Sequence, residues 1–246
     1  MKVAVCVSGI PRSGRLERDI TKNLKSVVCA LPQADVFIGT WDAYYSKAKD
    51  LFGLNKNIWS FEEPVINYHP YIDIPETLVK TDKLKKMIKQ SHDSAELRKH
   101  YSHQTKQIIA HGLMVNQLFP RYDVIIRVRF DTFVYKGADF NPYITECFET
   151  GTTFGFAWAS AIGDFNKDRR LPKDSQYSER FLFDQLIIHR MDRFDPSLVF
   201  DLSKRHLLLP AEFGWWQVMS EPYNNTHVCV CGWANPDKNV EDKYLL

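Results

Sequence analysis

The residues of this chain best suited to chemistry are two arginines and an aspartate at the end of an apolar segment. Arg127, Arg129 and Asp131 follow Val124–Ile126, and in an extended chain their alternation places all three on one face. Buried charges need partners. Arginine binds phosphate oxygens in a planar fork, and Mg²⁺ or Mn²⁺ takes carboxylate oxygens, so the three residues suit a diphosphate with a divalent cation. The alternative is an internal ion pair at the end of a strand.

A second group of polar residues follows the first apolar segment. Ser8 and Gly9 form a small turn where a ligand can approach the backbone closely, and Arg12 adds a positive charge beside it. No complete Walker motif for phosphate is present. The alternative is an ordinary turn between a strand and a helix, and the sequence alone leaves both interpretations open.

A third group follows the second apolar segment. Trp41 could stack on a base or a sugar, and Asp42 could hold a ribose hydroxyl, with Thr40 directly before them. The alternative makes Trp41 a core residue and Asp42 the N-cap of a helix. The two interpretations have equal support from the sequence.

All three groups depend on strands whose carboxyl ends meet at one edge of a sheet. Apolar runs predict strands over 2–8, 35–40, 122–131 and 154–161, with late strands over 207–210 and 228–233. Apolar residues at three- and four-residue steps predict helices over 15–31, 96–118 and 179–191, whereas 52–75 is irregular with an isolated strand-like stretch at 64–68. Strand, helix and strand in succession imply a parallel βαβ unit, and ligands bind beyond the carboxyl ends of such strands.

The composition indicates one globular domain. The 246 residues are 44% hydrophobic and 25% charged, with a net charge of +2, which is typical of a folded protein and argues against a strongly basic DNA-binding domain. No apolar stretch is long enough to cross a membrane. Five cysteines without a secretory signal indicate reduced thiols, so we expect a cytoplasmic protein.

Taken in order, these segments form a series of short motifs. The series is Ser8-Gly9-Ile10-Pro11-Arg12, Asp35 to Trp41, Ser102-His103-Gln104 with Lys106, Tyr122 to Asp131, Asp184-Gln185 and Pro210-Ala211-Glu212. It resembles glycosyltransferases of the GT-A type, in particular a group found in bacterial surface-polysaccharide loci and in viral genomes. The match runs from residue 3 to residue 217, and its second and fourth motifs together are the specific ones.

The resemblance implies an α/β fold that is GT-A-like (Rossmann-like), with a mostly parallel central sheet and helices on both faces. It implies that the half over residues 1–135 binds a nucleotide-sugar donor and that the half over 136–246 binds the acceptor. The donor contacts are then expected from the motif residues Ser8, Gly9, Arg12, Thr40, Trp41, Asp42, Gln104, Lys106, Arg127, Arg129 and Asp131.

The resemblance also implies a divalent cation, Mn²⁺ or Mg²⁺, held by a motif commonly written D-x-D. This chain has Arg129-Phe130-Asp131 at that place, so Asp131 is the predicted metal ligand, and an arginine takes part of the cation's charge role. In the implied reaction a hydroxyl of a glycan or glycoprotein displaces the nucleoside diphosphate, and in an inverting route a carboxylate takes the proton. The sequence leaves a retaining route open as well. We predict Asp184 as this base, with Glu212 second, in the cytoplasm of the host cell if the protein is viral.

Two other functions compete with this one. A sulfotransferase, or another enzyme of phosphate-bearing nucleotides, would use Pro11-Arg12-Ser13-Gly14. A carbohydrate-binding module without catalysis would use Trp215 and Trp216 as sugar platforms, and it would have no need for charged residues gathered at a strand end.

Overall fold

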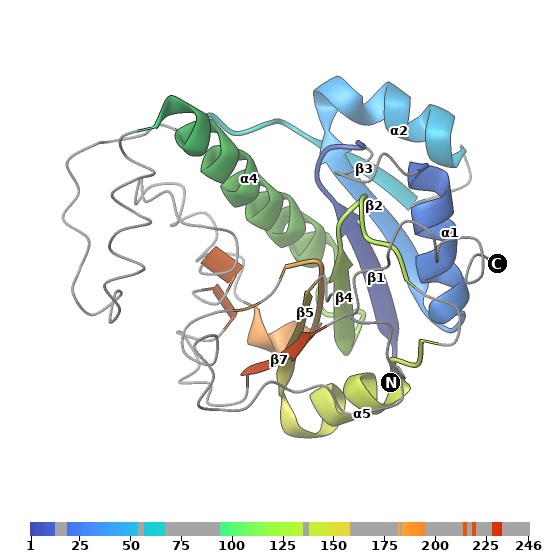
Figure 1. Cartoon of the computed structure of the whole chain (residues 1–246). Coiled ribbons are helices and arrows are strands. Elements are labelled where there is room, and N and C mark those ends of the chain that lie inside the picture. The colour runs from blue at the N-terminus through green and yellow to red at the C-terminus, as the bar shows by residue number, and fades with distance from the viewer. Residues whose placement is uncertain are drawn as a thin grey trace, which may run out of the picture.

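A seven-stranded sheet forms the centre of the protein (Figure 1). The computed structural model describes residues 1–12, 19–53, 57–66, 94–134, 138–157, 182, 184–194, 214–215, 218–219 and 228–232. The strands are β1 (Val3–Ser8), β2 (Asp35–Trp41), β3 (Asn57–Phe61), β4 (Val124–Val128), β5 (Thr153–Ala157), β6 (Leu186–Arg190) and β7 (Val228–Gly232). Their order across the sheet is β3-β2-β1-β4-β6-β5-β7.

The sheet is mostly parallel, as predicted. Strand β1 pairs in parallel with β2 and β4, β2 with β3, and β5 with β7. Only β6 runs against its neighbours β4 and β5. Because Leu186 at the start of β6 lies opposite Val128 at the end of β4, the residues just before β6 reach the edge where β1, β2 and β4 end.

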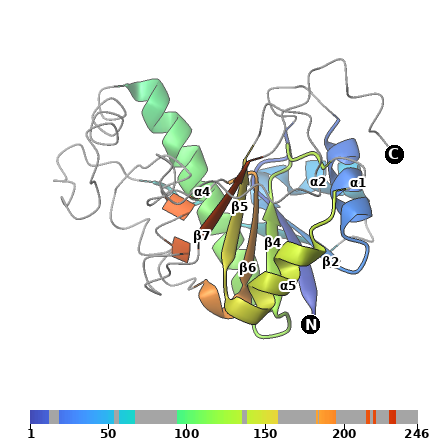
Figure 2. The same cartoon turned by 60° about the horizontal axis from the view of Figure 1, so that its bottom comes forward.

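Helices cover both faces of the sheet, which confirms the predicted layers (Figure 2). The helices are α1 (Ile20–Ala30), α2 (Tyr45–Phe52), α4 (Ala95–Leu118) and α5 (Asn141–Thr150). Alternate residues of β1 point to opposite faces: Val5 packs with residues of α1 and α5, whereas Cys6 packs with residues of α4. Apolar side chains therefore bury both faces of the strands, as is typical of parallel sheets.

Helix α4 lies close against the sheet. A Cβ atom on Gly39 of β2 would collide with the side chain of Met114, so the absence of a side chain there permits this approach. Farther along the same face, His111 of α4 and His189 of β6 are both buried, and their Nε2 atoms lie 3.0 Å apart. No helix in the described parts of the chain is long and apolar enough to span a membrane.

Most of the predicted elements are confirmed, with bounds that differ by a few residues. Helix α1 begins after Asp19, whose carboxylate accepts a hydrogen bond from the Thr21 backbone N–H at 2.8 Å, as an N-cap does. The predicted helix over 179–191 is wrong, because 186–190 form strand β6. A short apolar run such as Leu186-Ile187-Ile188 does not distinguish a buried strand from a helix, and its burial between β4 and β5 decides the outcome.

Three further elements differ from the sequence prediction. Residues 57–61 form β3 within the stretch predicted to be irregular, whereas 64–66 are not a strand and 67–68 lie outside the described residues. Helices α2 and α5 were not predicted. Helix α5 carries a proline in its first turn and ends at Gly151, whose φ of 75° is the left-handed conformation of a C-terminal cap. The strand predicted over 207–210 lies outside the described residues.

Candidate active site

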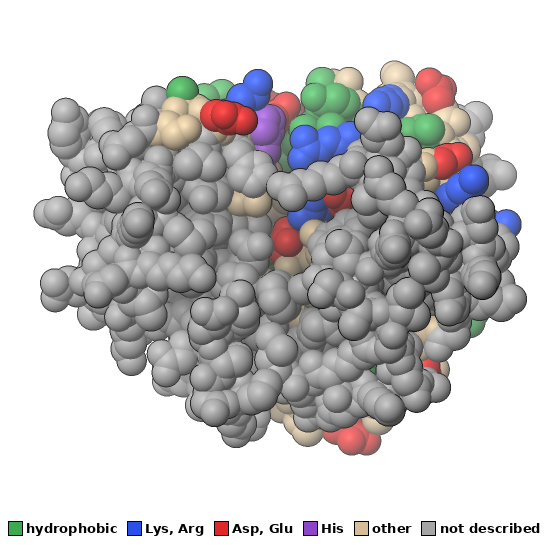
Figure 3. All heavy atoms as spheres, viewed as in Figure 1, with side chains coloured by type: hydrophobic (Ala, Val, Ile, Leu, Met, Phe, Trp, Pro, Cys, Tyr) green, Lys and Arg blue, Asp and Glu red, His purple; other side chains and the backbone are tan. Residues whose placement is uncertain are grey.

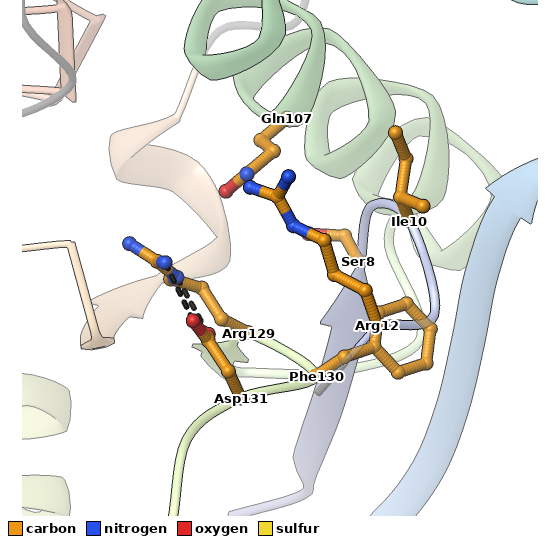
Figure 4. A pocket seen from close by; sticks show the side chains of 7 residues that line it. All are labelled: Ser8, Ile10, Arg12, Gln107, Arg129, Phe130 and Asp131. Atoms are coloured by element: carbon orange, nitrogen blue, oxygen red, sulfur yellow. Dashed lines mark hydrogen bonds and ion pairs between the residues drawn. The ribbon is translucent and has the colours of Figure 1, made fainter. Parts of the chain in front are cut away.

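A pocket opens at the carboxyl edge of the sheet, where two of the three predicted polar groups meet (Figure 4). We call it the edge pocket. Its lining residues are Ser8, Ile10, Arg12, Gln107, Arg129, Phe130 and Asp131. They come from the end of β1 and its following loop, from α4, and from the turn after β4. Figure 3, in the same view as Figure 1, shows basic and acidic side chains close together near the middle of the molecule.

Arg129 and Asp131 form a two-pronged ion pair in the edge pocket. The Nε and Nη2 atoms of Arg129 donate to Oδ1 and Oδ2 of Asp131, each at 2.7 Å. The Nη1 atom of Arg129 donates to Oδ2 of Asp184 at 3.2 Å. Burial alone would lower the pKa of Arg129, but the two carboxylates outweigh that effect and raise the pKa above its usual value, so this guanidinium stays charged.

The turn that carries this ion pair is held from two sides. The Thr132 hydroxyl accepts from the Arg129 backbone N–H at 3.1 Å and donates to the Gln185 carbonyl at 2.7 Å. The side-chain amide of Asn23, on α1, donates to the Phe130 carbonyl at 3.1 Å. Hydrogen bonds to α1 and to the residue before β6 therefore hold the backbone that carries the Arg129 side chain.

Arg127 is not part of the edge pocket. Its side chain is fully buried on the α4 face, and its Nη2 atom donates to Oε1 of Gln107 at 2.8 Å. Its Nη1 atom donates to the backbone carbonyl of Asp184, and its guanidinium carbon lies 4.7 Å from the ring centre of Trp215. Burial lowers the pKa of Arg127 to about 10. The prediction that Arg127 contacts a donor is therefore replaced by the alternative, an internal ion pair.

The edge pocket is rich in hydrogen-bond donors. The buried Ser8 hydroxyl has no hydrogen-bond partner among the described residues. Because Oε1 of Gln107 accepts from Arg127, the Gln107 side-chain NH₂ group remains to donate. Arg12 is exposed and forms no ion pair within the described parts of the chain. Both carboxylate oxygens of Asp131 already accept from Arg129, so the pocket favours an anion.

Gly9 brings the backbone close to these donors. Its φ of 120° is a conformation that side chains rarely adopt, and a Cβ atom there would lie 3.4 Å from Cγ of Gln107. Its N–H donates to the Gly39 carbonyl at 3.1 Å. The glycine predicted at this turn is thus needed for its backbone conformation, since a Cβ atom would make only an ordinary contact with Gln107.

Two predicted residues of α4 lie beside the edge pocket without lining it. Lys106 forms an ion pair with Glu63, with Nζ 2.8 Å from Oε1, and Gln104 is partly buried. His103, on the same helix, has its pKa lowered by burial and by the positive charges of Lys106 and Arg12. These two basic groups are therefore near enough to His103 to act on its charge.

The group after β2 does not reach the edge pocket. Trp41 is buried in the core beneath α4, so its predicted stacking on a ligand is wrong and its interpretation as a core residue is confirmed. Thr40 is buried as well. Asp42 is exposed and is the first residue of a short 3-10 helix whose N-cap is Trp41, so its predicted capping role is wrong. Its contact with a ribose hydroxyl stays a prediction.

Of the two predicted catalytic carboxylates, Asp184 is described by the structure and Glu212 is not. Asp184 is buried next to the start of β6, not at the start of a helix, and it contacts two guanidiniums rather than lining the edge pocket. Glu212 lies outside the described residues, as do Ser13, Gly14 and Trp216. Trp215 is buried against Arg127 and His111, so it is not a sugar platform.

Gln107 is the residue that the sequence analysis missed. It lies three positions after Gln104 on α4, close to one turn of the helix, and it contacts both the buried Arg127 and the edge pocket. The helical spacing of polar residues facing the end of β1 was the available signal.

The residues of the edge pocket do not fit a divalent cation. Such a cation takes several oxygen ligands, and both oxygens of the predicted ligand Asp131 already accept hydrogen bonds from Arg129 at 2.7 Å. Among the described residues, no group of three or more His, Cys, Asp or Glu side chains could hold a metal ion. The guanidinium of Arg129 therefore binds the carboxylate of Asp131, at the place where the sequence analysis predicted a cation.

Comparisons with known proteins find similar solved structures but no matching sequence family. No model of a protein family matches the chain, and no curated protein matches its sequence. A 4-diphosphocytidyl-2C-methyl-D-erythritol synthase from Anaerococcus prevotii is 10% identical, with 99% of this chain and 92% of that chain covered and a TM-score of 0.44. Mouse xyloside xylosyltransferase 1 is 11% identical, with 93% and 84% covered and a TM-score of 0.41.

A third solved structure is the core-mannan synthase A of Aspergillus fumigatus, in a form with Mn and GDP. It is 10% identical, with 89% of this chain and 70% of that chain covered and a TM-score of 0.41. At such identities the function of this chain has to be inferred from its own residues.

Proposed function

We propose that this chain is a glycosyltransferase that moves a sugar from a nucleotide-sugar donor to an acceptor hydroxyl. The observation that carries the proposal is the donor-rich edge pocket at the carboxyl ends of β1 and β4, with Arg12 and Arg129 in its lining. Ligands of parallel sheets bind at this edge, and guanidiniums suit phosphate oxygens. The motif series from Ser8 to Asp131 supports a sugar nucleotide as the ligand.

Transfer of the sugar requires that the negative charge on the leaving nucleoside diphosphate be stabilised. The acceptor oxygen forms a bond to the anomeric carbon while the bond from that carbon to the diphosphate breaks, and negative charge grows on the diphosphate. Arg129, fixed by Asp131 and Asp184, would stabilise this charge without having to reorient, and Arg12 would add a second positive charge. The acceptor proton goes to a carboxylate base.

The base is a separate part of the proposal. Asp184 is engaged by two guanidiniums, so we assign it to the positioning of Arg129 rather than to proton transfer. Glu212 then remains the candidate base from the sequence. The resemblance extends the proposal to an acceptor glycan or glycoprotein bound by the half over 136–246, in the synthesis of surface glycans.

The test begins with ligand binding. We expect a nucleoside diphosphate from a panel of UDP, GDP, CDP and ADP to raise the Tm of the protein, because a ligand that binds only the folded state stabilises it. The matching nucleotide-sugar should then lose its sugar to an acceptor glycan or, slowly, to water. A chain that binds none of the four diphosphates would contradict the proposal and favour a carbohydrate-binding module.

Arg12 provides the variant for this test. We expect Arg12→Gln to weaken diphosphate binding at least about tenfold, because a hydrogen bond to a charged group contributes about 1.5–3 kcal/mol. The matched control is Arg121→Gln, since Arg121 is an exposed arginine before β4, at the other edge of the sheet. Equal affinities of both variants and the unchanged protein, measured by calorimetry, would remove Arg12 from the site. Turnover of a sulfuryl donor instead of a nucleotide-sugar would favour the sulfotransferase.

A further inference from the structure

We propose that the edge pocket binds the donor diphosphate without a divalent cation, and that the guanidinium of Arg129 stands where a cation would join a carboxylate to the phosphates. This inference rests on the proposed function, because it takes a nucleoside diphosphate as the ligand. It differs from the expectation of Mn²⁺ or Mg²⁺ held by Asp131, and it starts from what now contacts that carboxylate.

The contacts of Arg129 leave part of its guanidinium for a ligand. A guanidinium has five N–H groups; Nε and Nη2 each donate one to Asp131, and Nη1 donates to both carboxylate oxygens of Asp184. The second N–H on Nη2 has no partner among the described residues, in a side chain that lines the edge pocket.

The charges of the cluster balance before any ligand binds. Arg127 and Arg129 are matched by Asp131 and Asp184, which contact them within 4 Å. In a D-x-D site two carboxylates are balanced by a divalent cation, so an arginine in place of the first aspartate gives the same local sum with no metal. Adding a cation beside Arg129 would bring like charges together, and among the described residues of the cluster no unpaired carboxylate compensates for them.

Other groups of the edge pocket then supply what the ligand still needs. Arg12 adds a positive charge that no described carboxylate neutralises, and its side chain extends over the pocket toward Gln107 (Figure 4). The unpartnered, buried hydroxyl of Ser8 and the NH₂ group of Gln107 add neutral donors. A diphosphate can use all of these donors, and such a set is how proteins bind phosphate without metal.

The decisive measurement compares binding with and without metal. The nucleoside diphosphate that raises the Tm most would be titrated into the full chain by calorimetry, first in EDTA and then with MnCl₂. We expect the two Kd values to agree within about twofold, because the fixed guanidinium supplies the charge. Binding that needs Mn²⁺, or that gains tenfold or more from it, would overturn the inference and leave the proposed function standing. No binding in either buffer would overturn both.

Two substitutions of Arg129 sharpen the test. Arg129→Gln should weaken binding in EDTA at least about tenfold, since a charged donor is lost. The matched control is Arg190→Gln, which removes an arginine with the same spacing to an aspartate, Asp192, at the opposite edge of the sheet and should leave the Kd unchanged. Unweakened binding by Arg129→Gln would overturn the inference.

The second substitution converts the site. Arg129→Asp places a carboxylate two positions before Asp131, and we expect this variant to bind the diphosphate weakly in EDTA and at least about tenfold more tightly with Mn²⁺. Electron paramagnetic resonance of Mn²⁺ gives a readout independent of activity: bound Mn²⁺ is expected for this variant with nucleotide and not for the unchanged chain. Bound Mn²⁺ in the unchanged chain with nucleotide would contradict the proposal, and Arg129→Gln keeps it testable if Arg129→Asp fails to fold.

Discussion

Two arginine–aspartate pairs of the same spacing lie at opposite ends of the strand pair β4 and β6. Arg129 and Asp131 follow β4, and Arg190 and Asp192 stand at the end of β6. In each pair the Nε and Nη2 atoms of the arginine donate to the two carboxylate oxygens two residues on. The local geometry is therefore shared, and the sequence spacing accounts for it.

The surroundings of the two pairs differ. The side chains of Arg129 and Asp131 are 20% and 12% exposed, and Asp184 adds a second carboxylate. The side chains of Arg190 and Asp192 are 29% and 56% exposed. Exposed pairs contribute little to stability. The comparison teaches that the arginine–aspartate motif is a local structure, and that its position at the carboxyl edge, beside a buried carboxylate and a pocket, makes one pair a candidate site.

The largest expected difference is in the free energy of unfolding, between losing Asp184, the second carboxylate beside the buried pair, and losing Asp192 of the exposed pair. Asp184→Ala leaves Arg127 buried and unpaired, so we expect a loss of about 3–5 kcal/mol in the free energy of unfolding. Asp192→Ala removes an exposed partner and should cost less than about 1 kcal/mol. Urea unfolding followed by circular dichroism measures both. Similar losses in the two variants would show that burial does not separate the pairs.

Acid should distinguish the Arg190–Asp192 pair from the buried histidines beside it. Burial lowers the pKa of His189 from 6.5 to about 4 and holds the pKa of His111 well below 6.5. The charged groups that act on His111 are His189 and Arg127, and the one that acts on His189 is Asp192. Below pH 6.5 these two histidines therefore bind protons in the unfolded chain but stay neutral in the folded chain. Stability falls as the pH falls from 6.5 toward 4, by up to about 1.4 kcal/mol per pH unit for each histidine.

The aspartate of that pair titrates in a different window. The hydrogen bonds from Arg190 lower the pKa of Asp192 below 3.8, so its contribution is present above pH 3.8 and is lost only as the pH falls through that lower value. Urea midpoints between pH 7 and 4.5 should show the same slope in Asp192→Asn as in the unchanged chain, and a smaller slope in His189→Gln. A slope that disappears in Asp192→Asn would assign the acid sensitivity to the surface pair.

The smallest expected effect tests what Asp131 does in its pair. Asp131→Asn keeps one side-chain oxygen for Arg129 and removes a negative charge near the bound anion, so we expect the Kd for the diphosphate to change less than about threefold. Asp192→Asn, its counterpart in the exposed pair, should leave the Kd unchanged. Complete loss of binding in Asp131→Asn would indicate a metal ligand and would break the comparison in favour of a D-x-D site.

Much of the frame follows from local sequence signals. The apolar runs at Val3–Ser8 and Val124–Val128 predict two strands that the structure pairs in parallel, and helix 96–118 is confirmed as α4. The same signals fail at 186–190, where a buried strand has the apolar periodicity expected of a helix. The short runs of α2 and α5 were too weak to be predicted.

The sequence by itself determined that charged residues would stand at the carboxyl ends of apolar strands, since strand polarity and side-chain alternation are local properties. It also made a bond between Arg129 and Asp131 possible, because residues two apart are near each other in an extended segment or turn, but it left this ion pair as the alternative to a metal site. Only the tertiary structure decided that Arg127 is internal, that Trp41 belongs to the core and that Asp184 and Gln107 join the cluster. The physical reason is that burial and long-range neighbours depend on how β6 and α4 pack against β1 and β4, which no short stretch of sequence encodes.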